Sequence, residues 1–203
     1  MPLCLTFIDL KKAFDSVETE AVLEALGNHG IPTQYIKILR ELHSNFTSRI
    51  SPFYDDITID VNRGVRQVDT VSSKLFSATF GDVMRRPEWD CMGVQVDGDL
   101  NIFAFRSADD IVLITPDISG AESVLANFDD GCGNISLHLN LTKTMSMKNG
   151  WVPDAPFSLN GTTISECSSY LYLGREVNMM NDLAPEQGRR NERLGELTRA
   201  SRT

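Results

Sequence analysis

The stretch Ile102-Phe-Ala-Phe-Arg-Ser-Ala-Asp-Asp-Ile-Val-Leu-Ile114 places two adjacent carboxylates between two apolar runs. Both runs are short and rich in aromatic or β-branched residues, which favours strands over helices. Asp109 and Asp110 would then lie at the turn of a hairpin. An Asp-Asp pair in a turn is most often a solvated surface feature, so the pair alone does not define a site.

A third carboxylate follows the first apolar run of the chain. Leu3 to Ile8 is continuously apolar apart from Thr6 and ends at Asp9, as expected of a strand buried on both faces. An unpaired acid at the end of such a strand would be costly. If this strand and the 102–114 hairpin are neighbours in an antiparallel sheet, three carboxylates converge. Close carboxylates repel one another unless a cation neutralises them, which points to a divalent metal site.

Periodicity elsewhere predicts both helices and strands. Helices are expected at 18–28, 34–44 (with Tyr35, Ile38, Leu39 and Leu42 on one face), 72–86, and from a cap at Ser119, paired with Glu122, to Gly131 and Gly133. Further strands are expected at 94–96, 157–159, 162–164 and 170–173, with a hairpin over 49–61. From Pro185 onward the chain is polar and charged, which predicts a helix or a frayed tail.

Length and composition limit the kinds of protein that this sequence can form. With 203 residues, 41% of them hydrophobic, the chain can bury one sizeable core. The run from Leu3 to Ile8 is too short for a membrane helix and lacks the features of a signal peptide. We therefore expect an intracellular protein, in the cytoplasm or nucleus, without a membrane partner. The four cysteines have no C-x-x-C spacing and are expected to be free thiols.

The net charge is the main objection to a nucleic-acid-binding function. The formal charge is −9, whereas proteins that bind phosphates usually carry clustered Lys and Arg. A domain that concentrates metal-binding acids, with basic surface supplied elsewhere, would still be compatible with this balance.

Several segments together resemble one family, the reverse transcriptases of non-LTR retrotransposons. Phe7-Ile-Asp-Leu-Lys-Lys-Ala-Phe-Asp15 resembles the first palm motif of this family, and Ala108-Asp-Asp-Ile-Val-Leu113 resembles its metal-binding hairpin. Three more segments resemble the remaining motifs of the family: Arg63-Gly-Val-Arg-Gln67, Leu139-Asn-Leu-Thr-Lys143 and Tyr172-Leu-Gly174. The ordered set is far more specific than any one element.

The resemblance implies an α+β fold, a polymerase palm with an antiparallel sheet backed by helices. Residues 1–178 would form this palm domain, and 179–203 would be a charged segment that begins the thumb or frays. Because the first motif lies so near residue 1, we expect the fingers to be missing and the thumb to be partial.

The implied reaction is RNA-directed DNA synthesis on an RNA template, with a DNA primer 3′-hydroxyl attacking a deoxynucleotide. Two Mg²⁺ ions, for which Mn²⁺ can substitute, would be held by Asp9, Asp109 and Asp110. Lys143 would protonate the departing pyrophosphate. Alternatively, Lys143 is an ordinary solvated lysine that follows a strand.

The remaining implied roles concern substrate contacts. Phe14 would pack under the incoming sugar and exclude a ribose, although an ordinary core aromatic explains it about as well. Arg66 and Gln67 would approach the nascent base pair. The turn that holds the primer end would be formed by Tyr172, Leu173 and Gly174. A plain β-turn is the alternative for this last segment.

The missing fingers, Val68 and the net acidity lead us to expect weak or no synthesis by the chain alone, because each weakens substrate binding. Val68 stands where the family carries glycine; two further departures are Ser73 in place of a proline and Ser107 in place of an aromatic residue. A β-branched residue disfavours positive φ and adds bulk beside the nucleotide. The alternatives are a catalytically inactive retrotransposon-derived remnant, a different palm-fold enzyme such as a nucleotide cyclase, and a metal-free α+β binding module.

Overall fold

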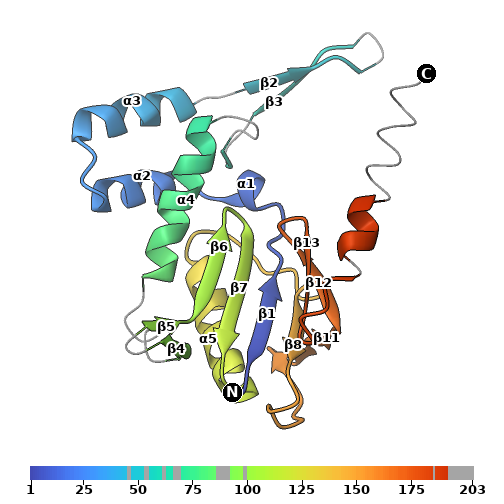
Figure 1. Ribbon diagram of the computed structural model, residues 1–203. Coiled ribbons are helices and arrows are strands. Elements are labelled where there is room, and N and C mark those ends of the chain that lie inside the picture. Colours follow the sequence, from blue (N-terminus) through green and yellow to red (C-terminus); the bar gives the residue numbers. More distant parts are fainter. Residues whose placement is uncertain are drawn as a thin grey trace.

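The computed structural model describes residues 1–44, 47–52, 55–60, 63–65, 70–85, 92–97, 100–184 and 186–191. Its centre is a five-stranded sheet in the order β11-β8-β1-β7-β6 (Figure 1). These strands are β1 (Cys4–Ile8), β6 (Ala104–Ser107), β7 (Asp110–Thr115), β8 (Met145–Lys148) and β11 (Ser165–Glu166). The expected α+β fold is confirmed. The sheet is mixed, because β11 runs parallel to β8 while the other pairs are antiparallel.

The central strand is β1, the first apolar run of the chain. It pairs with β7 on one side and with β8 on the other, so its backbone is hydrogen-bonded along both edges. Phe7 and Ile8 are almost fully buried. An uninterrupted apolar run suits this position, since both faces of the strand are covered.

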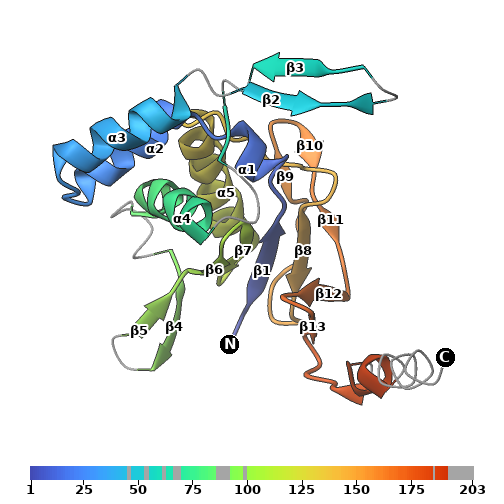
Figure 2. The same cartoon turned by 90° about the horizontal axis from the view of Figure 1, so that it is seen from above.

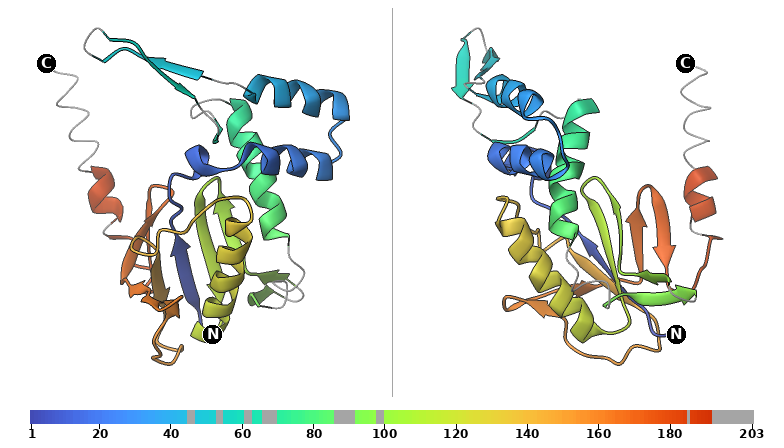
Figure 3. Two further views of the ribbon diagram at one scale, coloured as in Figure 1. Left: turned by 180° about the vertical axis from the view of Figure 1, so that it is seen from behind. Right: turned by 90° about the vertical axis from the view of Figure 1, so that its left-hand side faces the viewer.

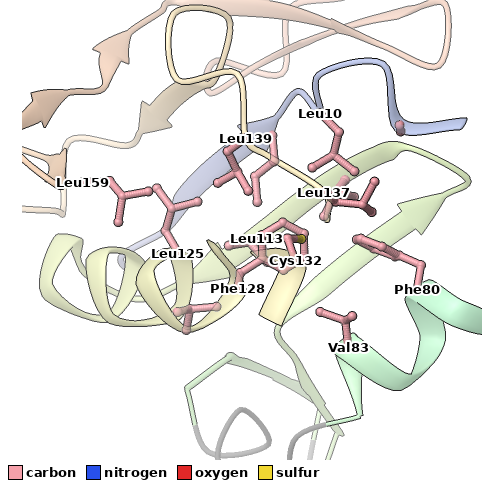
Figure 4. Packing of buried hydrophobic residues seen from close by; sticks show 14 of the residues in the cluster. Leu10, Phe80, Val83, Leu113, Leu125, Phe128, Cys132, Leu137, Leu139 and Leu159 are labelled. Carbon is pink, nitrogen blue, oxygen red and sulfur yellow. The ribbon is translucent and has the colours of Figure 1, made fainter. Parts of the chain in front are cut away.

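Two helices cover one face of the sheet, as seen from behind and from the side in Figure 3. They are α4 (Thr70–Met84) and α5 (Ile118–Gly133). The main core fills the space between them and the sheet (Figure 4). It includes Phe80 and Val83 of α4, Leu125, Phe128 and Cys132 of α5, and Leu113 of β7.

The helix predicted to start at Ser119 begins slightly earlier. Asp117 is the N-cap, and its carboxylate accepts a hydrogen bond from the Gly120 N–H at 2.6 Å. Ser119 therefore lies inside the helix, and the predicted cap is wrong. The backbone of Asp117 is extended, as an N-cap requires, so its carboxylate can accept a hydrogen bond from a free N–H of the first turn.

The opposite face is covered by a hairpin of β12 (Ser169–Tyr172) and β13 (Arg175–Asn178). A second, smaller cluster lies here, with Phe7, Val112 and Met147 at its centre. The ring of Tyr170 stacks on that of Phe7 with centroids 4.0 Å apart. The sheet is thus buried on both faces, by helices on one and by this hairpin on the other.

A further layer lies beyond one end of the sheet (Figure 2). It contains α1 (Ala13–Ser16), α2 (Thr19–Asn28), α3 (Thr33–His43) and the hairpin of β2 (Thr47–Ile50) and β3 (Ile57–Asp60). The helix predicted at 34–44 is confirmed as α3. Much of its apolar face is open to solvent, since Tyr35, Ile38 and Leu42 are each more than half exposed.

Short elements complete the described structure. They are β4 (Val94–Asp97) with β5 (Leu100–Ile102), and β9 (Ser158–Leu159) with β10 (Thr162–Thr163). The run expected as one strand at 102–105 is split between β5 and β6. Residues 186–191 continue as a helical turn, 192–203 lie outside the described residues, and the domain division after residue 178 stays a prediction.

Two expectations from composition can be compared with this fold. Cys4, Cys132 and Cys167 are free thiols, while Cys91 is outside the described residues. Within the described parts of the chain, no helix has the length and apolar character needed to cross a bilayer.

Candidate active site

Asp9 and Asp110 leave neighbouring strands side by side. The last registered pair of β1 and β7 is Ile8 with Ile111, so the next residue of each strand along the same edge is Asp9 and Asp110. Side chains alternate along a strand, and Phe7 and Val112 both face the β12–β13 hairpin. Asp9 lies two positions after Phe7, and Asp110 lies two positions before Val112, so both acids share that face.

The third predicted acid lies at the tip of the β6–β7 hairpin. Ser107 pairs with Asp110, which leaves Ala108 and Asp109 as the two loop residues. Ala108 has φ 54°, the positive value that the first position of a two-residue hairpin loop requires. Asp109 is exposed there, one residue from Asp110.

The electrostatics of the site reflect this crowding. Asp110 is itself exposed at the start of β7, but partial desolvation raises its pKa, and the nearby charges of Asp109 and Asp9 raise it further. The same two strand-end acids, Asp9 and Asp110, help to raise the pKa of Tyr170, for which burial is the larger cause. The three carboxylates therefore form one region of negative potential that a cation would relieve.

The described side chains alone do not form a complete coordination shell for a metal ion. Across the described residues, no group of three His, Cys, Asp or Glu side chains is arranged to hold an ion by itself. Magnesium commonly takes one or two carboxylates and completes its shell with water and substrate phosphates. The pair Asp9 and Asp110, with Asp109 beside it, fits that kind of ligand set.

Asn140 is a site residue that the sequence did not single out. Its amide Nδ2 donates a hydrogen bond to Asp9 Oδ2 at 2.9 Å, and its main-chain N–H donates to the Asp9 carbonyl oxygen at 2.8 Å. The sequence contained Asn140 only as one letter of a motif. The structure places it in the turn after Leu139, which forms a β-bridge with Leu10, and no signal in the sequence alone indicated this contact.

Lys143, the predicted proton donor to the departing pyrophosphate, belongs to the same turn. Its main-chain N–H donates to the Asn140 carbonyl oxygen at 3.0 Å, and its side chain is exposed. Lys143 is thus connected to Asp9 through one residue, although it is remote from it in sequence. The structure links them through the turn and not through a contact between the two side chains.

Phe14 is positioned by α4 and by a glycine-bearing loop. Its ring stacks on Phe76 with centroids 4.7 Å apart. Its carbonyl oxygen accepts a hydrogen bond from the Val65 N–H at 2.7 Å. Gly64 has φ 90°, and a Cβ atom there would lie 2.8 Å from the carbonyl oxygens of Phe14 and Asp15.

This close approach docks residues 63–65 against α1. A side chain at position 64 would prevent it, so the glycine is required for both its conformation and its lack of volume. Arg66 and Gln67, which follow in the sequence, lie outside the described residues, as does Val68.

The predicted primer turn approaches the acids from the other hairpin. Leu173 and Gly174 connect β12 to β13 with φ of 48° and 76°, the pattern of a type I′ turn. The Tyr172 hydroxyl donates a hydrogen bond to the Asp110 carbonyl oxygen at 3.3 Å. The structure therefore brings together four residues: Asp9, Asp110, Asn140 and Tyr172. Phe14 lies in α1, and its ring packs against α4.

Comparison with known proteins gives a family match over most of the chain. The family described as "Reverse transcriptase (RNA-dependent DNA polymerase)" matches residues 2–177. Among curated proteins, the chain is 33% identical over 133 residues to the "Retrovirus-related Pol polyprotein from type-1 retrotransposable element R2" of Nasonia vitripennis. That alignment covers 64% of the chain and 12% of the R2 protein, so the chain spans only a small part of this relative.

Two other comparisons agree. A transposon-derived protein of Caenorhabditis elegans is 32% identical over 94 residues, which is 44% of the chain and 34% of that protein. Among solved structures, apo telomerase from Candida tropicalis superposes with a TM-score of 0.63 at 12% identity, over 88% of the chain and 32% of the telomerase. The same enzyme in complex with a fragment of telomeric RNA gives a TM-score of 0.60 over 87% of the chain and 28% of that structure.

Proposed function

Because the chain belongs to the reverse transcriptase (RNA-dependent DNA polymerase) family, we propose that it is a polymerase palm of retrotransposon origin that binds magnesium through Asp9, Asp109 and Asp110. The proposed reaction is addition of a deoxynucleotide to a DNA primer on an RNA template. The observation that carries the proposal is the adjacency of Asp9 and Asp110 on neighbouring strands and on one face of the sheet.

The proposed ligands come from a rigid part of the fold. β1 and β7 are hydrogen-bonded to each other and packed on both faces, so their ends hold the carboxylates in fixed positions. Two bound Mg²⁺ ions, or Mn²⁺ in their place, would stabilise the attacking and leaving oxygens of an in-line phosphoryl transfer. Desolvation, and after it the charges of Asp109 and Asp9, raise the pKa of Asp110, and a bound cation would offset both effects.

The other proposed roles concern substrate contacts. Phe14 is half-buried and its ring stacks on Phe76, and in the proposed role it would pack under the incoming sugar. Arg66 and Gln67, which lie outside the described residues, would approach the nascent base pair.

Lys143 has an exposed ammonium, which suits proton donation to the departing pyrophosphate. The turn formed by Tyr172, Leu173 and Gly174 would hold the primer end. The hydrogen bond from Tyr172 to Asp110 supports this assignment, because it joins that turn to the metal-binding strand.

Primer extension tests the proposal directly. The full chain is incubated with an RNA template, an annealed DNA primer, deoxynucleotides and Mg²⁺ or Mn²⁺, in parallel with Asp9→Asn, Asp109→Ala and Asp110→Asn. Each substitution is expected to abolish whatever synthesis the wild type shows. Asp130→Asn, an exposed acid on α5 across the sheet, is the matched control and should extend like the wild type. Synthesis that persists in all three site variants would refute the assignment.

A catalytically silent palm that still binds metal is the second candidate, favoured by the net charge of −9. Such a protein would bind Mg²⁺ through Asp9 and Asp110 yet extend no primer. Metal binding measured separately from synthesis distinguishes the two candidates.

A further inference from the structure

We propose that Asn140 is a positioning residue that fixes the orientation of the Asp9 carboxylate for metal binding, and that Thr142 fixes the Asn140 amide in turn. This inference rests on the proposed metal-binding role of Asp9. It adds two residues, from a turn more than a hundred positions away in sequence, to the working parts of the site.

The contact between Asn140 and Asp9 is made at two points. The Asn140 amide Nδ2 donates to Asp9 Oδ2 at 2.9 Å, and the Asn140 main-chain N–H donates to the Asp9 carbonyl oxygen at 2.8 Å. The main-chain bond fixes where Asn140 sits, so the amide restricts rotation of the Asp9 side chain. A carboxylate accepts several hydrogen bonds, so one donor at Oδ2 leaves the other oxygen and further lone pairs for a cation.

The amide of Asn140 is itself held in one orientation. The Thr142 hydroxyl donates to Asn140 Oδ1 at 2.8 Å, which occupies the amide oxygen and leaves the NH₂ group to face Asp9. Without this bond, a rotation of the amide would present its oxygen to the carboxylate and remove the contact. Thr142 therefore acts on Asp9 only through Asn140.

A second threonine closes the network around the backbone. The Thr144 hydroxyl donates to the Asn140 carbonyl oxygen at 3.1 Å and lies 3.4 Å from the Asp9 N–H, from which it accepts. Thr144 is fully buried. The end of β1 and the 140–144 turn are thus joined as one unit, which is how a positioning contact stays in register.

The chemistry of an amide suits this role better than that of a charged donor. Asn140 orients Asp9 without neutralising it, so the full negative charge remains for a cation. A lysine or arginine in its place would form an ion pair with Asp9 and compete with the metal. A carboxylate in its place would repel Asp9 and lose the donated bond.

Metal affinity of the 203-residue chain is the measurement that tests the inference. Mg²⁺ binding is followed by isothermal titration for wild type, Asn140→Ala and Thr142→Val. Circular dichroism establishes the temperature range in which each variant is folded. Loss of an outer hydrogen-bond partner of a metal ligand typically weakens affinity about 10- to 100-fold, and we expect Asn140→Ala to fall in that range. Thr142→Val should weaken binding less.

Asn28→Ala is the matched control. Asn28 makes the same kind of bond, from its amide to Asp82 at 3.2 Å, on the exposed surface between α2 and α4. Its removal should leave Mg²⁺ affinity unchanged. A merely structural role for Asn140 would alter stability without changing the affinity of the folded protein.

The outcomes separate this inference from the proposed function. If wild type binds Mg²⁺ and Asp9→Asn does not, but Asn140→Ala and Thr142→Val bind as wild type, the positioning role is overturned and the metal site stands. If wild type does not bind Mg²⁺, both are overturned. Should Asn140→Ala fail to fold, Thr142→Val decides, because it leaves Asn140 and its main-chain bond in place.

Discussion

The hydroxyl of Tyr172 donates a hydrogen bond to the main-chain carbonyl oxygen of Asp110, 3.3 Å away. This bond joins the β12–β13 hairpin to the first residue of β7, beside the carboxylates. With the stacking of Tyr170 on Phe7, it makes the hairpin one wall of the candidate site as well as a cover for the sheet.

Replacing Tyr172 with phenylalanine removes this hydroxyl and keeps the ring. A hydrogen bond of this kind contributes about 0.5–1.5 kcal/mol, and the partly exposed position favours the lower end. The free energy of unfolding, measured with urea, should fall by about 0.5 kcal/mol. Tyr170→Phe, which retains the stacked ring on Phe7, is the control. If both variants lose the same free energy of unfolding, the hydrogen bond from Tyr172 to Asp110 makes no specific contribution to stability.

Gly64→Ala should be clearly destabilising. The backbone there has φ 90°, and the added Cβ would lie 2.8 Å from two carbonyl oxygens of α1. Strain of this kind costs about 1–3 kcal/mol, measurable as a lower melting temperature. Gly133→Ala, at the end of α5 with open space around it, is the matched control and should change stability little. A Gly64→Ala variant as stable as wild type would mean that residues 63–65 do not dock against α1.

Asp110→Asn should stabilise the protein in the absence of divalent metal. Burial and the charges of Asp109 and Asp9 disfavour the ionised carboxylate, so a neutral isostere removes an unfavourable interaction. Thermal denaturation with EDTA should give a higher melting temperature for the variant. Added Mg²⁺ should then raise the melting temperature of wild type but not that of Asp110→Asn, because a ligand stabilises only the state that binds it. A higher melting temperature in the exposed control Asp130→Asn would remove the site-specific explanation.

Glu186 gives a prediction of pH dependence. Arg190, the Glu176 N–H and Arg189 together lower the pKa of Glu186 from its usual 4.5 to about 2. The folded protein therefore favours the ionised form, and this stabilisation is complete above about pH 4.5 and is lost as the pH falls toward 2. Glu186→Gln should be less stable than wild type at pH 7, and the difference should shrink across that interval.

The control for this variant is Glu24→Gln, an exposed residue of α2. Its melting temperature should follow that of wild type at each pH. A gap between wild type and Glu186→Gln that stays constant from pH 7 to pH 2 would contradict the prediction.

The parts of the fold that could be predicted are those in which local pattern and tertiary environment agree. The apolar run before Asp9 predicted a strand buried on both faces, and β1 is that strand at the centre of the sheet. The Asp109-Asp110 pair fell between two strand-like runs, and it lies at the β6–β7 turn. The same agreement holds for α2 and α4, whose apolar residues recur at helical spacing and are buried in the core.

The elements that could not be predicted depend on partners distant in sequence. β8 has the sequence Met-Ser-Met-Lys, with no β-branched or aromatic residue, and is a strand because β1 offers it a hydrogen-bonding edge. The exposure of the α3 face is likewise a tertiary property that periodicity does not reveal.

The candidate site divides in the same way. Its carboxylates could be proposed from the sequence because Asp9 ends an apolar, strand-like run and the Asp109-Asp110 pair falls between two others, so that one sheet can bring them together. Asn140 could not, since an amide in a turn has many ordinary explanations and its bond to Asp9 spans 131 positions.

The central place of the first strand has a consequence for biosynthesis. Cys4 pairs with both Thr115 and Lys148, so β1 must wait for segments that are synthesised much later before the sheet can close. On a translating ribosome, a nascent chain that has not yet released β8 carries β1 with one edge unpaired. An open apolar edge invites intermolecular pairing, so chaperone capture or delayed collapse of this segment is built into the order of synthesis.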